Sequence, residues 1–595
     1  MTLPPGIVYL GLNFHYLIIP PACVYTIDRL VVQFFECQIP RWLFILACML
    51  AFPTAFTTVV LYKLHVDESE AAAHGAVLPP CLPDKYIGGY ETLSRRLAES
   101  KSVKYIGEFL NSIREQHGNT VNMRTLFENK IFTCEPENIK MILATEFDGF
   151  EKGDLFHSYM TSLLGTGVFN SDGETWKFHR AMTRPFFSKE RIGHFNIFDR
   201  HAEDAIGQTK TRARQGYPID FQDMVSRFTL DSATDFLFGN NVRSLSAGLP
   251  YPDNSPLTSS YDLSHPANVF AQAFDRAQKL STLRARYGSS WPLLEFWKDN
   301  VKVYRDIVDK FIDPILAEAI AKKKAIDTPG MNDGVREVKD GETLLDHLVN
   351  YTEDPKILKD ETLNIMIAGR DTTAATLTFI IYMLAEHPEV MIRLREEIMQ
   401  MVGSSRRPTY DDLRDMKYMR AVINETLRLF PPVPFNVRMT TRPAIWPSKT
   451  GGKPYYIPPR TRAQYSVFLM HRRKDLWGPD ALDFDPNRWL DQRLHKYLTP
   501  NPFIFLPFNA GPRICLGQQF AYNEISFFLI RFLQSFSSVS LAPDAQPSCS
   551  RPPADWANAP GRKGIEKIVI KSHLTMCALN GLWVRLEEGN DAETL

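Results

Sequence analysis

Residues 508–517 read Phe-Asn-Ala-Gly-Pro-Arg-Ile-Cys-Leu-Gly, and they place Cys515 in a tight loop that leads directly into an amphipathic run, Gln518 to Phe536. Gly511 permits the strained backbone of a sharp loop, and Gly517 lets the backbone approach a flat partner closely. The free amides and the dipole at the start of the following helix favour an ionised sulfur. The stretch therefore predicts a thiolate that can hold iron; the alternative for a single free thiol is a buried, inert cysteine beside a turn.

Five positions of this stretch, taken together, carry a family resemblance: Phe508, Gly511, Arg513, Cys515 and Gly517. The segment resembles the cysteine-ligand loop of cytochrome P-450, the haem-thiolate monooxygenases. The resemblance implies haem b (iron protoporphyrin IX) with Cys515 as its axial ligand, Arg513 as a propionate partner and Phe508 packed near the sulfur. A cysteine ligand favours cleavage of the dioxygen bond. The resemblance also implies the fold of the family, a helical prism that is mainly α with a small β-rich lobe.

Length and composition agree with that interpretation. A chain of 595 residues can bury a large core, and 68 Lys and Arg balance 68 Asp and Glu, so nothing in the net charge favours nucleic acid and we expect none. The eight cysteines are scattered without a CxxC pair, which disfavours structural zinc and a secreted disulfide scaffold.

The N-terminus contains an apolar segment between Arg41 and Lys63. Its 21 residues, Trp42 to Tyr62, carry no charge, are long enough to cross a bilayer as a helix, and show no amphipathic stripe that would indicate a buried core helix. We therefore expect an N-terminal transmembrane helix and contact with the lipid bilayer.

A second uncharged stretch, Leu3 to Ile27, is interrupted by Pro20 and Pro21. It either spans the membrane, lies at its interface or forms an apolar arm, and if both stretches span, the two chain ends share one side. We expect a membrane-anchoring segment over 1–66, a linker with a proline-rich hinge over 67–89, and the haem domain over 90–595.

Helical periodicity dominates beyond residue 90, with short strands expected near 121–133, 436–444, 455–457 and 568–586. A long helix is predicted from the cap Asp354-Pro355 to His387-Pro388. Its middle, Ala368 to Thr373, contains a glycine and two threonines, which favour a local bulge; the alternative is threonines that bond back to carbonyls in an ordinary helix. The segment resembles the family's oxygen-binding groove, which implies that Thr372 hydrogen-bonds dioxygen and Asp371 relays protons.

Glu425 and Arg428 lie three residues apart on one helix face, where such a pair is by default a surface ion pair. The family resemblance, which includes Phe484 to Trp489, implies instead a buried structural triad of Glu425, Arg428 and Arg488 that holds the cysteine loop.

Trp176 and Arg180 form a Trp-x-x-x-Arg unit with both ends on one helical face. By itself this pattern is typical of a surface cation stacked on an aromatic ring. Beside the cysteine loop it resembles the helix whose tryptophan and arginine meet the haem propionates. Arg438 is a further candidate, since guanidinium matches carboxylate geometry.

A finer resemblance lies in the motif wording at 368–373, 424–434 and 507–521, which is similar to fungal membrane-bound cytochromes that hydroxylate n-alkanes and fatty acids. It implies insertion of one oxygen atom from O2 into a C–H bond of a small hydrophobic substrate, with residues 433–437 and 163–169 as candidate pocket walls. No flavin or nicotinamide fingerprint follows the cysteine loop, so we expect electrons from NADPH through a separate reductase, with cytochrome b5 as a second candidate donor. The expected location is the endoplasmic reticulum membrane, with the haem domain facing the cytoplasm.

Two alternative functions are compatible with the sequence. Within the family, the chain is a broad xenobiotic, aromatic or sterol oxidase. From another class, it is a membrane-tethered haem or lipid-binding protein without turnover, which would have no need for Asp371, Thr372 and Cys515 together.

Overall fold

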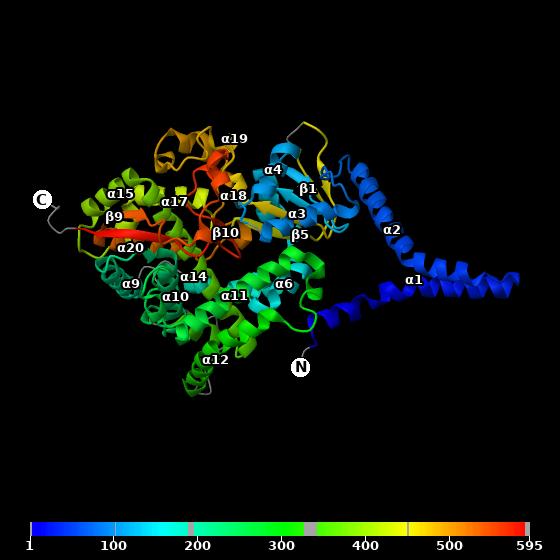
Figure 1. Ribbon diagram of the computed structural model, residues 1–595, viewed down its shortest axis with the longest axis horizontal. Helices are drawn as coiled ribbons and strands as arrows, with labels where there is room; N and C mark the ends of the chain where they lie inside the picture. The colour runs from blue at the N-terminus through cyan, green and yellow to red at the C-terminus, as the bar shows by residue number, and fades with distance from the viewer. Residues whose placement is uncertain (1–2, 102, 188–194, 327–341, 449–450, 590–595) are drawn as a thin grey trace.

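The computed structural model describes residues 3–101, 103–187, 195–326, 342–448 and 451–589. Two long N-terminal helices, α1 (Pro5–Phe35) and α2 (Arg41–Ala73), project from a mainly helical body that begins near residue 90 (Figure 1). The α-helices of the body are α3 (Tyr90–Lys101), α4 (Glu108–His117), α5 (Pro136–Lys140), α6 (Asp154–Leu164), α7 (Gly173–Thr183), α9 (Asn196–Arg214), α10 (Phe221–Phe238), α11 (Pro266–Tyr287), α12 (Asn300–Ile326), α13 (Leu344–Val349), α14 (Pro355–Glu386), α15 (Pro388–Met401), α16 (Tyr410–Asp415), α17 (Lys417–Leu429), α18 (Val467–Met470), α19 (Lys474–Trp477) and α20 (Gln518–Ser535).

The strands are short and gather in small sheets. They are β1 (Thr120–Asn122), β2 (Lys130–Thr133), β3 (Phe150–Glu151), β4 (Ile219–Asp220), β5 (Phe435–Thr440), β6 (Ala444–Trp446), β7 (Tyr455–Ile457), β8 (Arg462–Ser466), β9 (Phe536–Leu541), β10 (Ile570–Ser572), β11 (Met576–Ala578) and β12 (Trp583–Glu588). Within the described residues the largest sheet has the order β1-β2-β8-β5-β3, with β2 and β8 parallel and the other neighbours antiparallel. The mainly helical fold with a small β-rich lobe is thus confirmed.

Helix α14 is the centre of the body and packs against α10, α17 and α20. It begins where the sequence predicts, because the Asp354 side chain accepts a hydrogen bond from the Lys356 amide and Pro355 occupies the first turn. Its second half, 374–384, is buried all round, and Phe379 stacks on Phe430 with 4.8 Å between ring centroids. A helix buried on every face is fixed in position by packing, so it is a rigid reference for the groups it carries.

The N-terminal helices are both long and apolar enough to cross a membrane. Helix α2 extends through Asp67 to Ala73, so the first part of the expected linker is helical. Its last turns pack on the body: Ala71 is buried, and Tyr456 bonds to Glu70.

Candidate functional site

The loop before α20 presents Cys515, and its shape depends on Gly511. That glycine has φ +66°, and a Cβ there would lie 1.8 Å from the carbonyl oxygen of Leu143, so only glycine fits. The Cys515 amide donates to the Phe508 carbonyl at 3.0 Å, which closes the loop three residues before α20 begins. A Cβ at Gly517 would meet the Phe187 ring at an ordinary 3.7 Å, so the chain itself imposes no strong need for glycine there.

A cavity of about 810 Å³ opens beside this cysteine. Its walls come from α7, the turn after α7 and the cysteine loop: Trp176, Arg180, Arg184, Pro185, Phe187, Gly511, Pro512, Ile514, Cys515 and Leu516. Cys515 is exposed into this space, yet the surrounding atoms desolvate it. A volume of this size accommodates a cofactor.

The state of the sulfur differs from the sequence expectation. Burial raises the pKa of the Cys515 thiol above its ordinary value, while the Gly517 amide and the Arg180 charge act in the opposite direction without prevailing. The helix start alone therefore does not ionise this thiol. An ionised sulfur at Cys515 needs a cationic partner, and a metal ion deprotonates a coordinating thiol outright.

Cations converge next to the cavity. Arg513 donates to Asp172 at 2.6 Å and lies over Trp176, 4.5 Å from the ring centroid, while Arg180 donates to the Ile514 carbonyl at 2.8 Å. Burial, followed by the nearby Arg438 charge, lowers the pKa of Arg513 to about 10.

Lys152, which follows strand β3, belongs to the same group of cations. Burial and the charges of Arg438 and Arg513 lower the pKa of the Lys152 ammonium. Asp172 lies nearest these cations, but it also binds His157 at 3.0 Å and the amides of Lys152 and Gly153 at 2.9 Å. The excess of buried positive charge, with the Nε of Arg513 buried and unpartnered among the described residues, fits a ligand with two carboxylates.

Sequence reasoning missed Lys152 because it stands in a short connection without periodicity or motif. Only the fold brings it to Arg513, more than 300 residues away.

Asp371 and Thr372 lie on α14 and do not line the 810 Å³ cavity. The expected bulge is wrong: α14 is continuous, and the Thr372 hydroxyl donates to the Ala368 carbonyl at 2.7 Å, as in the alternative weighed above. This hydrogen bond satisfies the hydroxyl inside the helix, which removes the local reason for opening it. Asp371 contacts Arg370 at 3.3 Å, and burial raises its pKa, whereas Arg370 and a hydrogen bond from Gln278 act to lower it.

Glu425, Arg428 and Arg488 meet in the interior. Arg428 makes a two-pronged contact with Glu425, both distances 2.8 Å, and the Arg488 Nε lies 3.5 Å from the same carboxylate. All three side chains are buried, and Trp489 adds a bond to Glu425 at 3.1 Å. The carboxylate is therefore fully paired, and Arg428 lowers its pKa despite burial.

His471 links this cluster to the cysteine loop and was not found from the sequence. Its carbonyl accepts from Arg428 at 2.9 Å, and its ring accepts from the Leu506 amide at 2.9 Å. Burial lowers the pKa of His471 to about 3, so the ring stays neutral and keeps its lone pair for this bond. Tyr465 holds Asn509 in the same loop at 3.0 Å.

Comparisons with known proteins identify the family and several relatives of this chain. The model of the cytochrome P450 family matches residues 97–561. The cytochrome P450 monooxygenase himC of Aspergillus japonicus is 35% identical over 548 residues, covering 90% of this chain and 89% of the relative. Cytochrome P450 52A3-A of Candida maltosa is 37% identical over 432 residues, 70% of this chain and 77% of that protein. The cytochrome P450 monooxygenase pvhE of Talaromyces variabilis is 36% identical over 444 residues, 71% and 76% respectively.

Proposed function

Because this chain belongs to the cytochrome P450 family and is a monooxygenase of that family, we propose that it hydroxylates long-chain alkanes or fatty acids. The observation that supports haem binding through a thiolate is the position of Cys515 in the wall of a cavity, beside an excess of buried cations. The aliphatic substrate class is supported by the residues of the motifs at 368–373, 424–434 and 507–521, which are similar to those of fungal alkane and fatty-acid hydroxylases.

Cys515 would hold the haem iron, and Arg513, Arg438 and Lys152 would neutralise the propionates, with Arg180 and Trp176 on the same wall. Haem bound there supplies a redox-active iron that activates dioxygen. Phe508, whose ring lies 5.3 Å from that of Tyr522, would shield the sulfur from water. The triad of Glu425, Arg428 and Arg488 keeps the loop in shape through His471.

The overall reaction needs two electrons and two protons: one oxygen atom enters the substrate and the other leaves as water. Asp371 is suited to hold a proton, because burial raises its pKa although Arg370 and a hydrogen bond from Gln278 act in the opposite direction. Thr372 would pass it on through its hydroxyl, which keeps acceptor capacity while it donates to Ala368.

Electrons would come from NADPH through a separate reductase, with cytochrome b5 as an additional donor. The site of action would be the endoplasmic reticulum membrane, with the haem domain (90–595) on the cytoplasmic side. The apolar N-terminal helices support membrane attachment, where long aliphatic substrates concentrate.

The test combines spectroscopy with product analysis on the full chain. The reduced, carbon monoxide-bound difference spectrum should show haem-thiolate protein, Cys515→Ala should abolish it, and the exposed Cys549→Ala should keep it. Membranes supplied with a reductase and NADPH should convert dodecanoate or an n-alkane. Turnover of a polycyclic aromatic or a sterol alone would reject the aliphatic proposal, and a thiolate spectrum without any turnover would reject catalysis.

A further inference from the structure

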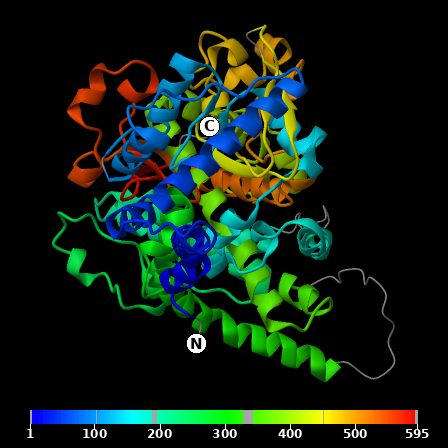
Figure 2. The same cartoon turned by 90° about the vertical axis from the view of Figure 1, so that its right-hand side faces the viewer.

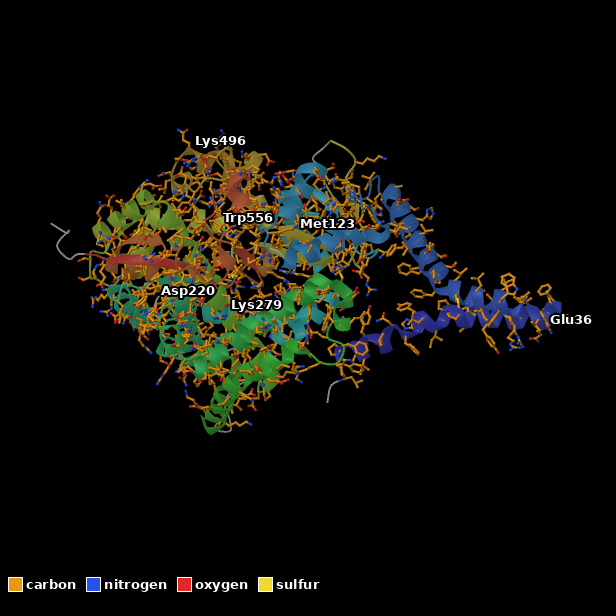
Figure 3. The ribbon with its side chains drawn as sticks, in the orientation of Figure 1. Glu36, Met123, Asp220, Lys279, Lys496 and Trp556 are labelled. Carbon is orange, nitrogen blue, oxygen red and sulfur yellow. The ribbon has the colours of Figure 1, made fainter. Side chains whose placement is uncertain are left out.

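Helices α1 and α2 form an antiparallel hairpin. The ring of Tyr25 in α1 lies 6.4 Å from that of Phe44 in α2, and the two helices contact each other directly. Glu36, at the C-terminal end of α1, lies at the end of the hairpin farthest from the haem domain (Figure 3). Because the two helices pack on each other and are joined by residues 36–40, the membrane position of α1 is tied to that of α2.

The lengths suit two crossings. At about 1.5 Å per residue, the 31 residues of α1 extend about 46 Å and the 33 of α2 about 50 Å, against a hydrocarbon core of about 30 Å. The apolar window of neither helix is buried inside the described part of the chain.

Charge is placed at the far end of the hairpin. Asp28, Arg29, Glu36 and Arg41 all lie in the part of the chain between the last turns of α1 and the start of α2, whereas α1 carries no charged residue from Pro5 to Ile27. A helix that lies along the interface needs a charged or strongly polar face over its whole length, and α1 has none. The pattern fits a helix that crosses and exposes its charged end to headgroups beyond.

The start of α1 returns to the haem domain. Gly6 is buried, and a Cβ there would lie 2.5 Å from both Cα and the ring of Phe296, in the segment between α11 and α12. At Gly11, farther along the same helix, a Cβ would meet nothing within 4 Å. The close approach is therefore specific to the first turn of α1. The neighbouring Trp297 is 74% exposed beside this contact.

Helix α2 meets the domain elsewhere. Its Phe56 ring lies 5.0 Å from the Phe127 ring in the β1–β2 turn. The two helices thus reach the haem domain at separate places, α1 beside the α11–α12 connection and α2 at the β-rich lobe (Figure 2).

We infer that α1 crosses the bilayer together with α2, so that the N-terminus lies on the same side of the membrane as the haem domain, with its first helical turn seated on Phe296. This inference is independent of haem chemistry, because it rests on the hairpin, the charges at its tip and the Gly6 contact.

Protease protection of full-length protein in sealed microsomes tests the topology. With epitope tags at both ends, proteinase K should remove the N-terminal tag whenever it digests the haem domain. A protected N-terminal tag beside a digested haem domain would overturn the inference, whether or not the protein has turnover.

Native cysteines give a second readout. Cys37 lies at the hairpin tip and Cys81 next to the β-rich lobe, and both are exposed. The difference in labelling between wild type and Cys37→Ser reports the labelling of Cys37. With a membrane-impermeant maleimide, this difference should be absent in sealed vesicles and present after detergent is added. The matched Cys81→Ser difference should be present in both. Labelling of Cys37 in sealed vesicles would contradict a hairpin that crosses the bilayer.

Cross-linking tests the contact between Gly6 and Phe296. Gly6→Cys with Phe296→Cys should form a disulfide on mild oxidation, while the control pair Gly11→Cys with Phe296→Cys should not. Equal cross-linking by both pairs, or by neither, would show that the first turn of α1 is not held on Phe296. A far-UV circular dichroism spectrum like that of wild type in both variants verifies folding.

Discussion

The imidazole ring of His471 accepts a hydrogen bond from the backbone amide of Leu506 at 2.9 Å, and both residues are buried. The carbonyl of the same histidine accepts from Arg428. One residue therefore connects the buried Glu425–Arg428 pair with the segment that leads to Cys515, so the stability of the cysteine loop depends on a neutral histidine.

His471→Ala should weaken the cysteine loop. The substitution leaves the Leu506 amide buried and unpaired, at a cost of about 1–3 kcal/mol. We expect a lower denaturation midpoint and a smaller thiolate fraction in the carbon monoxide difference spectrum. His471→Gln, which can offer an acceptor oxygen, should restore much of both; an alanine variant that matches wild type would show that the bond is dispensable.

Acid should destabilise the protein through the same residue. The ordinary pKa of histidine is about 6.5, whereas that of His471 in the folded chain is about 3. Below pH 6.5 the unfolded chain binds a proton that the folded chain does not, so this group favours unfolding as the pH falls from 6.5 towards 3. Between pH 7 and 5 its contribution is about 2 kcal/mol. His471→Gln should show a correspondingly flatter loss of stability in denaturant titrations, and parallel curves for the two proteins would refute the assignment.

Gly511→Ala should prevent formation of the cysteine loop. A left-handed backbone costs a non-glycine residue about 1–2 kcal/mol, and here the new Cβ would also lie 1.8 Å from the Leu143 carbonyl oxygen. Gly216→Ala is the matched control, with φ +77° and open space around it, so it carries the backbone cost alone. Haem content per polypeptide should fall sharply only in the first variant; equal haem content would argue against the clash.

Lys152→Met should loosen the haem. Removing one of the buried cations weakens the propionate site, so transfer of haem to apomyoglobin should become several-fold faster, and Lys152→Arg should slow it again. Lys177→Met, which removes an exposed lysine of α7 paired with Glu174, is the control. A transfer rate unchanged from wild type would exclude Lys152 from the cofactor site.

Thr372→Ala should uncouple electron use from product. Without this hydroxyl the supply of protons is impaired, so NADPH consumption should yield more hydrogen peroxide and less hydroxylated product. Thr376→Ala is the control, since Thr376 makes the same kind of bond, to the Thr372 carbonyl at 2.8 Å, one turn along α14. Equal coupling in the Thr372 variant and wild type would count against the proton role.

The sequence predicted those helices and strands that are specified by neighbouring residues. Helix α14 begins at its Asp354-Pro355 cap, and the expected strands near 121–133 and 455–457 form as β1, β2 and β7. Strand β8 was missed because its identity depends on pairing with β2 and β5, which come from distant parts of the chain.

The bulge expected at Ala368 to Thr373 was wrong for a physical reason. Poor helix formers weaken an isolated helix, but α14 is packed by its neighbours, and tertiary burial outweighs a propensity penalty of at most about 1 kcal/mol per residue.

The sequence alone determined that Cys515 stands in a glycine-dependent loop before a helix, because a left-handed backbone and a helix start are local properties. Tertiary structure alone decided how that sulfur and its cavity are charged. Desolvation and Coulomb interactions depend on groups such as Lys152, Asp172 and His471, which reach the loop from remote segments only when the chain folds.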